Sequence, residues 1–488
     1  MRTTLCIVLA LATQAVPAAS LPGVDAPVAT RHTAHIGSAQ VDYTASFAAT
    51  VLKDANGVPQ ATISATSYTR DGINDLAHRP VIFMFNGGPG ASSSPLHFSA
   101  LGPRRIVESG AERHLIDNDD SPLDVADLVF IDPVGTGFSQ VLPGGDGKAY
   151  WTMDGDAKAA LALVRDWLRV HDRTASPVYV AGQSYGGFRV AMMTKYAQDL
   201  PLAGLILVSP MLDASGTSEA PGNDLPYILN LPSMSALAWY HQRIARGGRT
   251  LEQQFAEATQ FAQGAYASAL MQGSALPARE RTRIAARMAT LTGLPATAIL
   301  AADLRLSTDA FRSQLLLSAR KVPAQEAGQE IGRLDGRIIA GKRPAKTAAQ
   351  PSGDPSLVVS GSRAAFIKAY YRDELHVLEN APYVTLSFAV NGGWNWHPGD
   401  DEPGGLFYLN ATPHIAALMQ HQPGTRLMLA GGYYDLAVPY LGAQYVLAHA
   451  GIAPSRIHVV GFASGHSPYD DAPGLHQFTR EIRAFTAP

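Results

Sequence analysis

Polar and apolar positions along the chain follow two different periods. Between residues 34 and 68 they alternate around a turn at 54–57, which predicts an antiparallel hairpin. Continuous apolar runs then alternate with amphipathic stretches, and this order predicts buried strands joined by helices. The expected strands are 80–85, 127–131, 178–181 and 204–208, and the expected helices are 154–170 and 188–197. Such alternation is typical of a mostly parallel sheet with helices on both faces.

The pattern changes after residue 211 and returns near residue 426. From 233 to 320 the apolar residues recur at helical spacing, with almost no strand pattern. A polar stretch with Pro and Gly at 341–355 predicts a flexible loop. Strands are expected again at 426–430 and 457–460, followed by a helix from about residue 474. The sequence therefore predicts one α/β domain interrupted by a helical insertion.

We place the boundaries of these parts from the changes in pattern alone. Residues 21–220 are expected to form the first part of the α/β core, 221–370 the mostly helical insertion, and 371–488 the second part of the core. Residues 1–20 contain one arginine, a short apolar run and then small residues. This order is typical of a signal peptide.

The predicted signal peptide has a cleavage site after Ala18 or after Ser20. Its apolar run is too short to cross a bilayer, and the alternatives are a membrane anchor or a buried first helix. Cys6, the single cysteine of the chain, lies in this segment, so the mature chain has no disulfide. Export without disulfides favours a bacterial periplasmic or secreted protein.

Composition narrows the classes of partner. Of the 488 residues, 46% are hydrophobic and 16% charged, which predicts a large core and excludes broad disorder. The net charge of -3 predicts no binding to nucleic acid and none to a membrane after signal removal. We find no cofactor motif, and His397 with residues 400–402 matches no standard zinc spacing, so no metal is expected. The oligomeric state is left open, with a homodimer among the alternatives.

A glycine-flanked serine carries the strongest chemical signal. Residues 182–187 read GQSYGG and lie between an expected strand and an expected helix. In this context G-x-S-x-G is a nucleophile elbow, with Ser184 at its tip; the alternative is an ordinary tight turn. The backbone N–H of Tyr185 and one from the glycine turn 86–90 (NGGPG) are the expected oxyanion donors.

A serine nucleophile needs a base, and the base needs an acid that orients it. The chain order Ser, Asp, His of such folds is met by Asp435 after the strand 426–430 and by His466 after the strand 457–460. Both follow the carboxyl ends of parallel strands, where these sheets bind ligands. The competing aspartates come after His466 (Asp470, Asp471) or follow no clear strand (Asp400, Asp401).

Four segments together resemble the serine carboxypeptidase family of α/β hydrolases. They are NGGPGASS at 86–93, FIDPVGTGFS at 130–139, the elbow at 182–187, and the segments around Asp435 and His466. The resemblance implies the α/β-hydrolase fold, a helical cap formed by the insertion, and release of C-terminal residues from peptide substrates. It also implies Ser184, Asp435 and His466 as the triad, and the N–H groups of Gly88 and Tyr185 as the oxyanion hole.

The chain departs from this family where the substrate carboxylate is expected to bind. The family uses the Asn of the first motif and a pair of glutamates that share a proton at acid pH. Here Asn86 is present, and Gln183 and Ala100 stand at the glutamate positions. We expect Asn86 and Gln183 to bind substrate, and an optimum less acidic than the family's, because an amide donates at any pH.

These departures keep other readings open. An arginine offers a bidentate carboxylate contact, for which the candidates are Arg104, Arg105 and Arg189. Ser467 follows His466 where the family usually has a larger apolar residue. An esterase or acyltransferase of the same fold is one alternative function. A catalytically silent relative that binds a peptide is the other.

Overall fold

The computed structural model describes residues 27–109, 112–318, 328–341, 354–357, 361–377, 381–397 and 409–487. Three of the sequence predictions fall outside these residues. They concern the signal peptide at 1–20, most of the expected flexible loop at 341–355, and the acidic residues at 400–402.

One nine-stranded sheet runs through the molecule, in the order β1-β2-β3-β7-β4-β8-β9-β12-β13. Its first three strands are antiparallel: β1 (Val28–Ile36), β2 (Ala39–Lys53) and β3 (Pro59–Arg70). The other six are parallel to one another: β4 (Val81–Phe85), β7 (Asp127–Asp132), β8 (Val178–Gln183), β9 (Leu202–Val208), β12 (Arg426–Gly432) and β13 (Ile457–Phe462). Every strand expected from the sequence is present. The continuous apolar runs β4 and β8 are buried on both faces, as central parallel strands must be.

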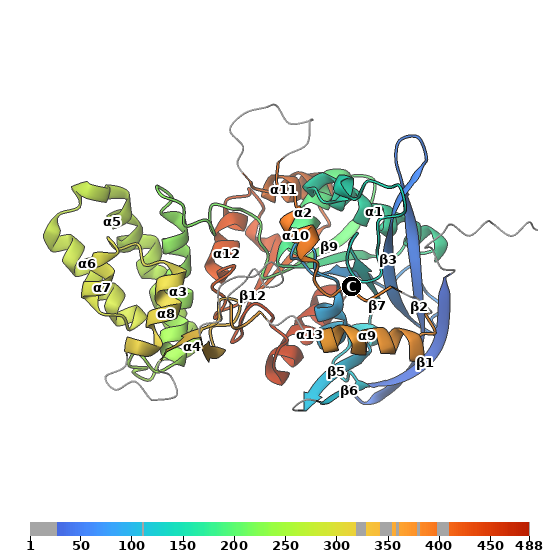
Figure 1. The fold of residues 1–488 in the computed structure, drawn as a ribbon, viewed down its shortest axis with the longest axis horizontal. Coiled ribbons are helices and arrows are strands. Elements are labelled where there is room, and N and C mark those ends of the chain that lie inside the picture. The colour runs from blue at the N-terminus through green and yellow to red at the C-terminus, as the bar shows by residue number, and fades with distance from the viewer. Residues whose placement is uncertain are drawn as a thin grey trace, which may run out of the picture.

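Helices cover both faces of the sheet (Figure 1). One face carries α1 (Met153–Val170), α2 (Tyr185–Tyr196), α10 (Phe388–Gly392), α11 (Thr412–His421) and α12 (Tyr440–Ala448). The opposite face carries η1 (Leu96–Leu101), α9 (Gly361–Asp373) and α13 (Ala472–Thr486). The predicted α/β-hydrolase architecture is therefore confirmed in its layers.

Short elements complete the core. They are the hairpins β5 (Arg104–Ser109) with β6 (Glu112–Asp117) and β10 (Gln329–Ile331) with β11 (Ile339–Gly341), and the single turns η2 (Pro122–Asp124), η3 (Gly147–Tyr150) and η8 (Pro454–Arg456). No helix of the described residues is long and apolar enough to span a bilayer.

The insertion forms a helical lobe beside α12, at the left of Figure 1. It comprises α3 (Leu225–Tyr240), α4 (Leu251–Phe261), η4 (Ala262–Tyr266), α5 (Ala267–Gln272), η5 (Gly273–Ala275), α6 (Ala278–Thr292), α7 (Ala296–Ala301), α8 (Thr308–Gln314) and η6 (Leu316–Ser318). Aromatic side chains join it to the core: Tyr240 lies 5.2 Å from Tyr434, and Phe255 lies 4.8 Å from Tyr433, between ring centroids.

Helix α9 lies for the most part in the range expected for the insertion (221–370), yet it packs on the sheet. The Tyr371 ring contacts Phe47 of β2 edge to face, and its hydroxyl lies 2.7 Å from Thr66 Oγ1 of β3. The tyrosines of α9 thus complete an aromatic cluster over the antiparallel strands. Helical spacing in the sequence shows an apolar stripe but not the surface that the stripe covers.

Candidate active site

Ser184 lies at a sharp turn between β8 and α2, as the elbow motif predicts. Its backbone has φ 60° and ψ -127°, a conformation that a residue with a side chain adopts only under constraint. Two hydrogen bonds impose it: Ser184 N donates to Val208 O at 2.9 Å, and Met211 N donates to Ser184 O at 3.1 Å. The serine is therefore held by β9 and by the chain that follows β9.

The glycine turn at 86–90 packs directly against this elbow. A Cβ atom at Gly87 would lie 2.5 Å from Tyr185 N and 2.8 Å from Gln183 O, so only glycine fits there. Gly88 has φ +103°, a value that favours glycine. The Ser184 side chain makes no capping hydrogen bond to the first turn of α2, whose N-terminus carries the positive end of the helix dipole. The turn and the helix start, which carry the two expected oxyanion donors Gly88 and Tyr185, thus pack against each other.

A buried ion pair lies beneath this turn. Arg189 has a side chain that is 0% exposed; its Nε donates to Asp156 Oδ2 at 2.6 Å and its Nη1 to Asn86 O at 2.7 Å. The guanidinium also lies over the rings of Phe85 and Tyr185. Burial raises the pKa of Asp156, and Arg189 acts against that shift. Arg189 therefore stabilises the glycine turn through its hydrogen bond to Asn86 O.

The structure corrects two of the arginine expectations. Arg189 is enclosed and paired, so it does not reach a substrate carboxylate. Arg104 is engaged by Asp117 and by Glu374, whose Oε1 lies 3.4 Å from Arg104 Nη2. In both cases the basic residue follows a motif in the sequence but is neutralised by a carboxylate that is distant in the chain.

Asp435 and His466 form a bonded pair. Asp435 Oδ2 lies 2.6 Å from His466 Nδ1, and its other oxygen accepts from Ala437 N at 2.8 Å and Val438 N at 3.0 Å. The Asp435 side chain is 0% exposed, and the His466 side chain is 12% exposed. An acid fixed in this way orients the imidazole and leaves Nε2 for proton transfer.

Among the described residues, no hydrogen bond joins the Ser184 hydroxyl to the His466 ring. Gln183, directly before Ser184, makes the link instead: its Nε2 donates to His466 O at 3.0 Å. Catalytic hydrogen bonds of this kind are often long or misaligned until substrate binds. The structure thus joins the loops of Ser184 and His466 through the Gln183 amide and the His466 carbonyl.

Residues 333–337, which we call the strap, hold both the acid loop and the base loop. The strap carbonyls of Arg333 and Leu334 accept from Leu436 N at 3.0 Å and from His466 N at 2.8 Å. Its Arg337 side chain donates to Ala463 O at 3.1 Å and to Asp471 Oδ2 at 2.8 Å. Sequence reasoning missed the strap, because backbone hydrogen bonds leave no residue pattern.

Asn86 and Gln183, the expected substrate-binding pair, are bonded to each other. Asn86 Nδ2 donates to Gln183 Oε1 at 2.5 Å, and the Tyr469 hydroxyl donates to the same oxygen. Asn86 Oδ1 accepts from Leu96 N at 3.1 Å. The two residues are only 5% and 3% exposed. Sequence reasoning also missed Tyr469, although it lies three residues after His466.

The second family motif supports the first. Asp132 of the segment 130–139 is buried, and its Oδ1 accepts from Ser93 N at 2.8 Å and Ser93 Oγ at 2.7 Å. Burial raises the pKa of Asp132, and these hydrogen bonds act in the opposite direction. The motif therefore fixes the chain that follows the glycine turn.

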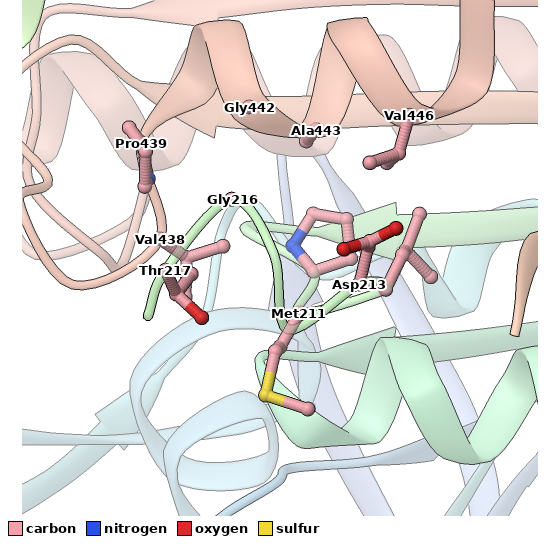
Figure 2. A pocket seen from close by; sticks show the side chains of 11 residues that line it. Met211, Asp213, Gly216, Thr217, Val438, Pro439, Gly442, Ala443 and Val446 are labelled. Atoms are coloured by element: carbon pink, nitrogen blue, oxygen red, sulfur yellow. The ribbon is translucent and has the colours of Figure 1, made fainter. Parts of the chain in front are cut away.

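A mostly apolar pocket lies where the chain after β9 meets the start of α12. Figure 2 shows residues of α12 on one side and Asp213 and Thr217 on the other. The lining residues are Pro210, Met211, Leu212, Asp213, Gly216, Thr217, Val438, Pro439, Gly442, Ala443 and Val446. The two walls follow directly on the segments that hold Ser184 and Asp435, since Met211 and Val438 bond to those residues.

Residues 68–236 match the serine carboxypeptidase family model. Two curated relatives agree: serine carboxypeptidase-like 36 of Arabidopsis thaliana, 32% identical over 145 residues, and pheromone-processing carboxypeptidase kex1 of Aspergillus niger, 32% identical over 123 residues. The matches cover 28% and 25% of this chain. They span only 29% and 19% of the relatives' own length.

A solved structure extends the likeness of fold over most of the chain. It is a prohormone-processing carboxypeptidase of Saccharomyces cerevisiae, with a TM-score of 0.55 and 16% identity, and the match covers 90% of this chain and 91% of that chain. Residues 68–236 are thus similar in sequence to serine carboxypeptidases, and the chain has an α/β-hydrolase fold.

Proposed function

We propose that the protein is a serine hydrolase of the carboxypeptidase type, which releases C-terminal residues from peptides through an acyl-enzyme. The observation that carries this proposal is the Asp435–His466 pair at 2.6 Å, joined to the elbow of Ser184 by the Gln183 amide. The match of residues 68–236 to the serine carboxypeptidase family model supports the peptide as substrate.

In this mechanism the Ser184 Oγ attacks the scissile carbonyl while His466 Nε2 accepts its proton. Asp435 keeps Nδ1 protonated and stabilises the imidazolium that forms. His466 then donates the proton to the leaving amine. Water enters, again activated by His466, and releases the acyl group from Ser184. No further group is needed for this sequence of proton transfers.

The carbonyl oxygen becomes negative in the tetrahedral intermediate. We assign its stabilisation to the N–H groups of Gly88 and Tyr185, which the close packing of the glycine turn on the elbow supports. Donors held before the reaction cost no reorganisation during it, and one such donor contributes about 10²–10³-fold to kcat. The Arg189–Asn86 hydrogen bond at 2.7 Å keeps this turn in place.

A second function, an esterase or acyltransferase, is favoured by one observation. Both Nε2 protons of Gln183 are engaged, by His466 O at 3.0 Å and Ser467 Oγ at 3.1 Å. This amide therefore offers no donor to a substrate carboxylate. An ester leaving group without a charge needs no such donor, and we keep this function as the alternative.

A paired comparison of substrates separates the two functions. A blocked dipeptide with a free C-terminus, the same dipeptide as its C-terminal amide, and a simple p-nitrophenyl ester are assayed across pH. The carboxypeptidase cleaves the free-acid peptide well above the amide, with an optimum near or above neutral pH. Cleavage of the ester alone supports the esterase, and a peptidase optimum at about pH 4–5 contradicts the less acidic profile.

A silent peptide-binding relative is tested separately. A fluorophosphonate probe is expected to modify the wild-type protein and not Ser184→Ala. Equal labelling of both proteins, or none of either, favours a silent relative. We also propose export from a bacterial cell with removal of a signal peptide. N-terminal sequencing of the exported protein checks the cleavage site.

A further inference from the structure

We propose that Gln183 is a positioning residue for the base His466, and that its amide makes this positioning independent of a proton. The inference rests on the proposed serine hydrolase mechanism and assigns Gln183 a part in that mechanism. It replaces the expectation that Gln183 binds the carboxylate of a substrate. The argument follows from the four hydrogen bonds of the Gln183 side chain.

All four hydrogen-bonding positions of the Gln183 amide are used within the protein. Its two N–H groups donate to His466 O and Ser467 Oγ, at 3.0 and 3.1 Å. Its oxygen accepts from Asn86 Nδ2 at 2.5 Å and from the Tyr469 hydroxyl. A side-chain amide can make two donated and two accepted bonds here, so nothing of Gln183 is left for a ligand.

The partners also fix which way the amide faces. A rotated amide would set its oxygen against the carbonyl oxygen of His466 and its NH₂ against the NH₂ of Asn86. Both contacts are repulsive, so the hydrogen-bond network itself selects the orientation. Burial raises the pKa of Tyr469, which keeps its hydroxyl protonated as a donor. The network is therefore complete and contains no group that must gain or lose a proton near neutral pH. Beside it lies Asp470, whose pKa burial and Asp335 raise to about 6 while Arg337 and His466 act against that shift, in the wild type and in any variant of Gln183.

This network ties the base to the nucleophile. Gln183 is the last residue of β8 and directly precedes Ser184. Its amide donates hydrogen bonds to the backbone carbonyl of His466 and to the side chain of Ser467. The peptide unit held in this way is the one that carries the imidazole. Without these two hydrogen bonds the base loop can move relative to Ser184, and a displacement of about 1 Å costs about 10²-fold in rate.

A carboxyl group at residue 183 would behave differently. An ionised glutamate has only acceptors, so it would face the carbonyl oxygen of His466 without a donor. It could hold the loop only while protonated, and protonation requires acid pH. At the second position of the family's pair, Ala100 is buried and offers only a methyl group, so no second carboxyl is there to share a proton. Gln183 thus supplies permanently the donor that a glutamate would supply only in acid.

Gln183→Glu tests this inference, with the p-nitrophenyl ester and the free-acid peptide as substrates. At about pH 8 we expect kcat to fall about 10²-fold for both substrates, with KM changed less than about threefold. At about pH 5 the variant recovers to within about threefold of wild type at that pH, because the protonated glutamate donates to His466 O. The pH above which the activity of the variant falls is therefore expected to shift into the acid range.

Tyr469→Phe is the matched control, because it removes one donor to the Gln183 oxygen and leaves both donors to the base loop. It is expected to lower kcat less than about tenfold without moving the pH profile. A carboxylate-binding role predicts instead a KM effect confined to the free-acid peptide, and that result overturns the inference. An unchanged pH profile of Gln183→Glu overturns it as well. Wild-type protein that hydrolyses neither substrate contradicts the proposed function itself, which is a separate outcome.

Discussion

On the nucleophile side of the site (residues 86–90 and 182–187) backbone packs directly on backbone, whereas the base side (residues 433–438 and 463–471) depends in addition on side chains and on the strap. A Cβ at Gly87 would overlap the Tyr185 amide, and Arg189 fixes the same turn through Asn86 O. The base side depends on Gln183, on Asp435, and on strap carbonyls that accept from Leu436 and His466.

The two sides also differ in how well a sequence reveals them. Close backbone packing requires glycine at fixed positions, so the nucleophile side can be recognised as a sequence motif. It lies within the residues 68–236 that match the family model. The acid and base lie outside that range. Their loops are held by hydrogen bonds from segments more than a hundred residues away, and many sequences can supply such bonds. The nucleophile side is thus held mainly by close backbone packing. The base side combines such packing, at Gly432 against Gly465, with hydrogen bonds from distant segments.

Asp435→Asn breaks the base side and has the largest expected effect. The amide would present NH₂ to His466 Nδ1 and force the proton onto Nε2, so the imidazole could not accept the proton of Ser184. We expect kcat to fall about 10⁴-fold, with little change in thermal unfolding. Steady-state kinetics and the rate of fluorophosphonate labelling measure this, and a loss below about tenfold contradicts Asp435 as the acid.

Gly87→Ala breaks the nucleophile side by steric overlap. Its Cβ would lie 2.5 Å from Tyr185 N, so the turn and the elbow must separate. We expect kcat to fall about 10²–10³-fold, as for loss of one oxyanion donor. Gly424→Ala is the matched control, because a Cβ there meets no heavy atom within 4 Å. Equal kinetics of the two variants would mean that the close packing does not matter for the reaction.

Arg337→Ala sharpens the comparison by loosening the strap. The variant loses the bonds to Ala463 O and Asp471 and the pair with the buried Asp335 of the strap itself, while the backbone bonds of the strap to the acid and base loops remain. Because those bonds remain, we expect kcat to fall by no more than about tenfold, mostly without a change in KM. Arg372→Ala is the control, since within the described part of the chain Arg372 pairs only with the adjacent Asp373 and is 63% exposed. A variant as inactive as Asp435→Asn would show that Arg337 has a direct role.

The smallest expected effect is on the free energy of unfolding, through His97, a buried residue that follows the glycine turn in the chain. His97 is 1% exposed, its ring stacks on those of Phe98 and Phe130, and burial holds its pKa well below 6.5. The unfolded chain therefore binds a proton below about pH 6.5 that the folded chain does not, and stability falls as pH decreases. His97 contributes up to about 1.4 kcal/mol per pH unit to this slope.

His97→Phe should reduce the acid loss of stability, measured by urea unfolding at about pH 7.5 and about pH 5.5. The quantity compared is the difference in unfolding free energy between the two pH values. His421→Phe is the control, because His421 is exposed. If both variants keep the slope of the wild type, His97 does not titrate between these conditions.

Much of the fold was predictable because its strands and helices have strong periods. The expected strands at 80–85 and 178–181 are β4 and β8, and the expected helix at 154–170 is α1 with one more residue, Met153. The surface on which α9 packs was not predictable. Its tyrosines find partners on β2 and β3, about three hundred residues away in the chain, and helical spacing contains no such information.

The sequence by itself determined the nucleophile side of this protein. Glycines at 87 and 88, the serine on its turn and the strands around it are local requirements, and local sterics leave a pattern in the residues. Only the tertiary structure decided how the base is held and what Gln183 does. Its amide looked free in the sequence, but folding surrounds it with four partners from two distant segments. Hydrogen bonds form between whichever groups the fold brings together. For this reason the sequence suggested that Gln183 binds substrate, whereas the structure places its amide in an internal network.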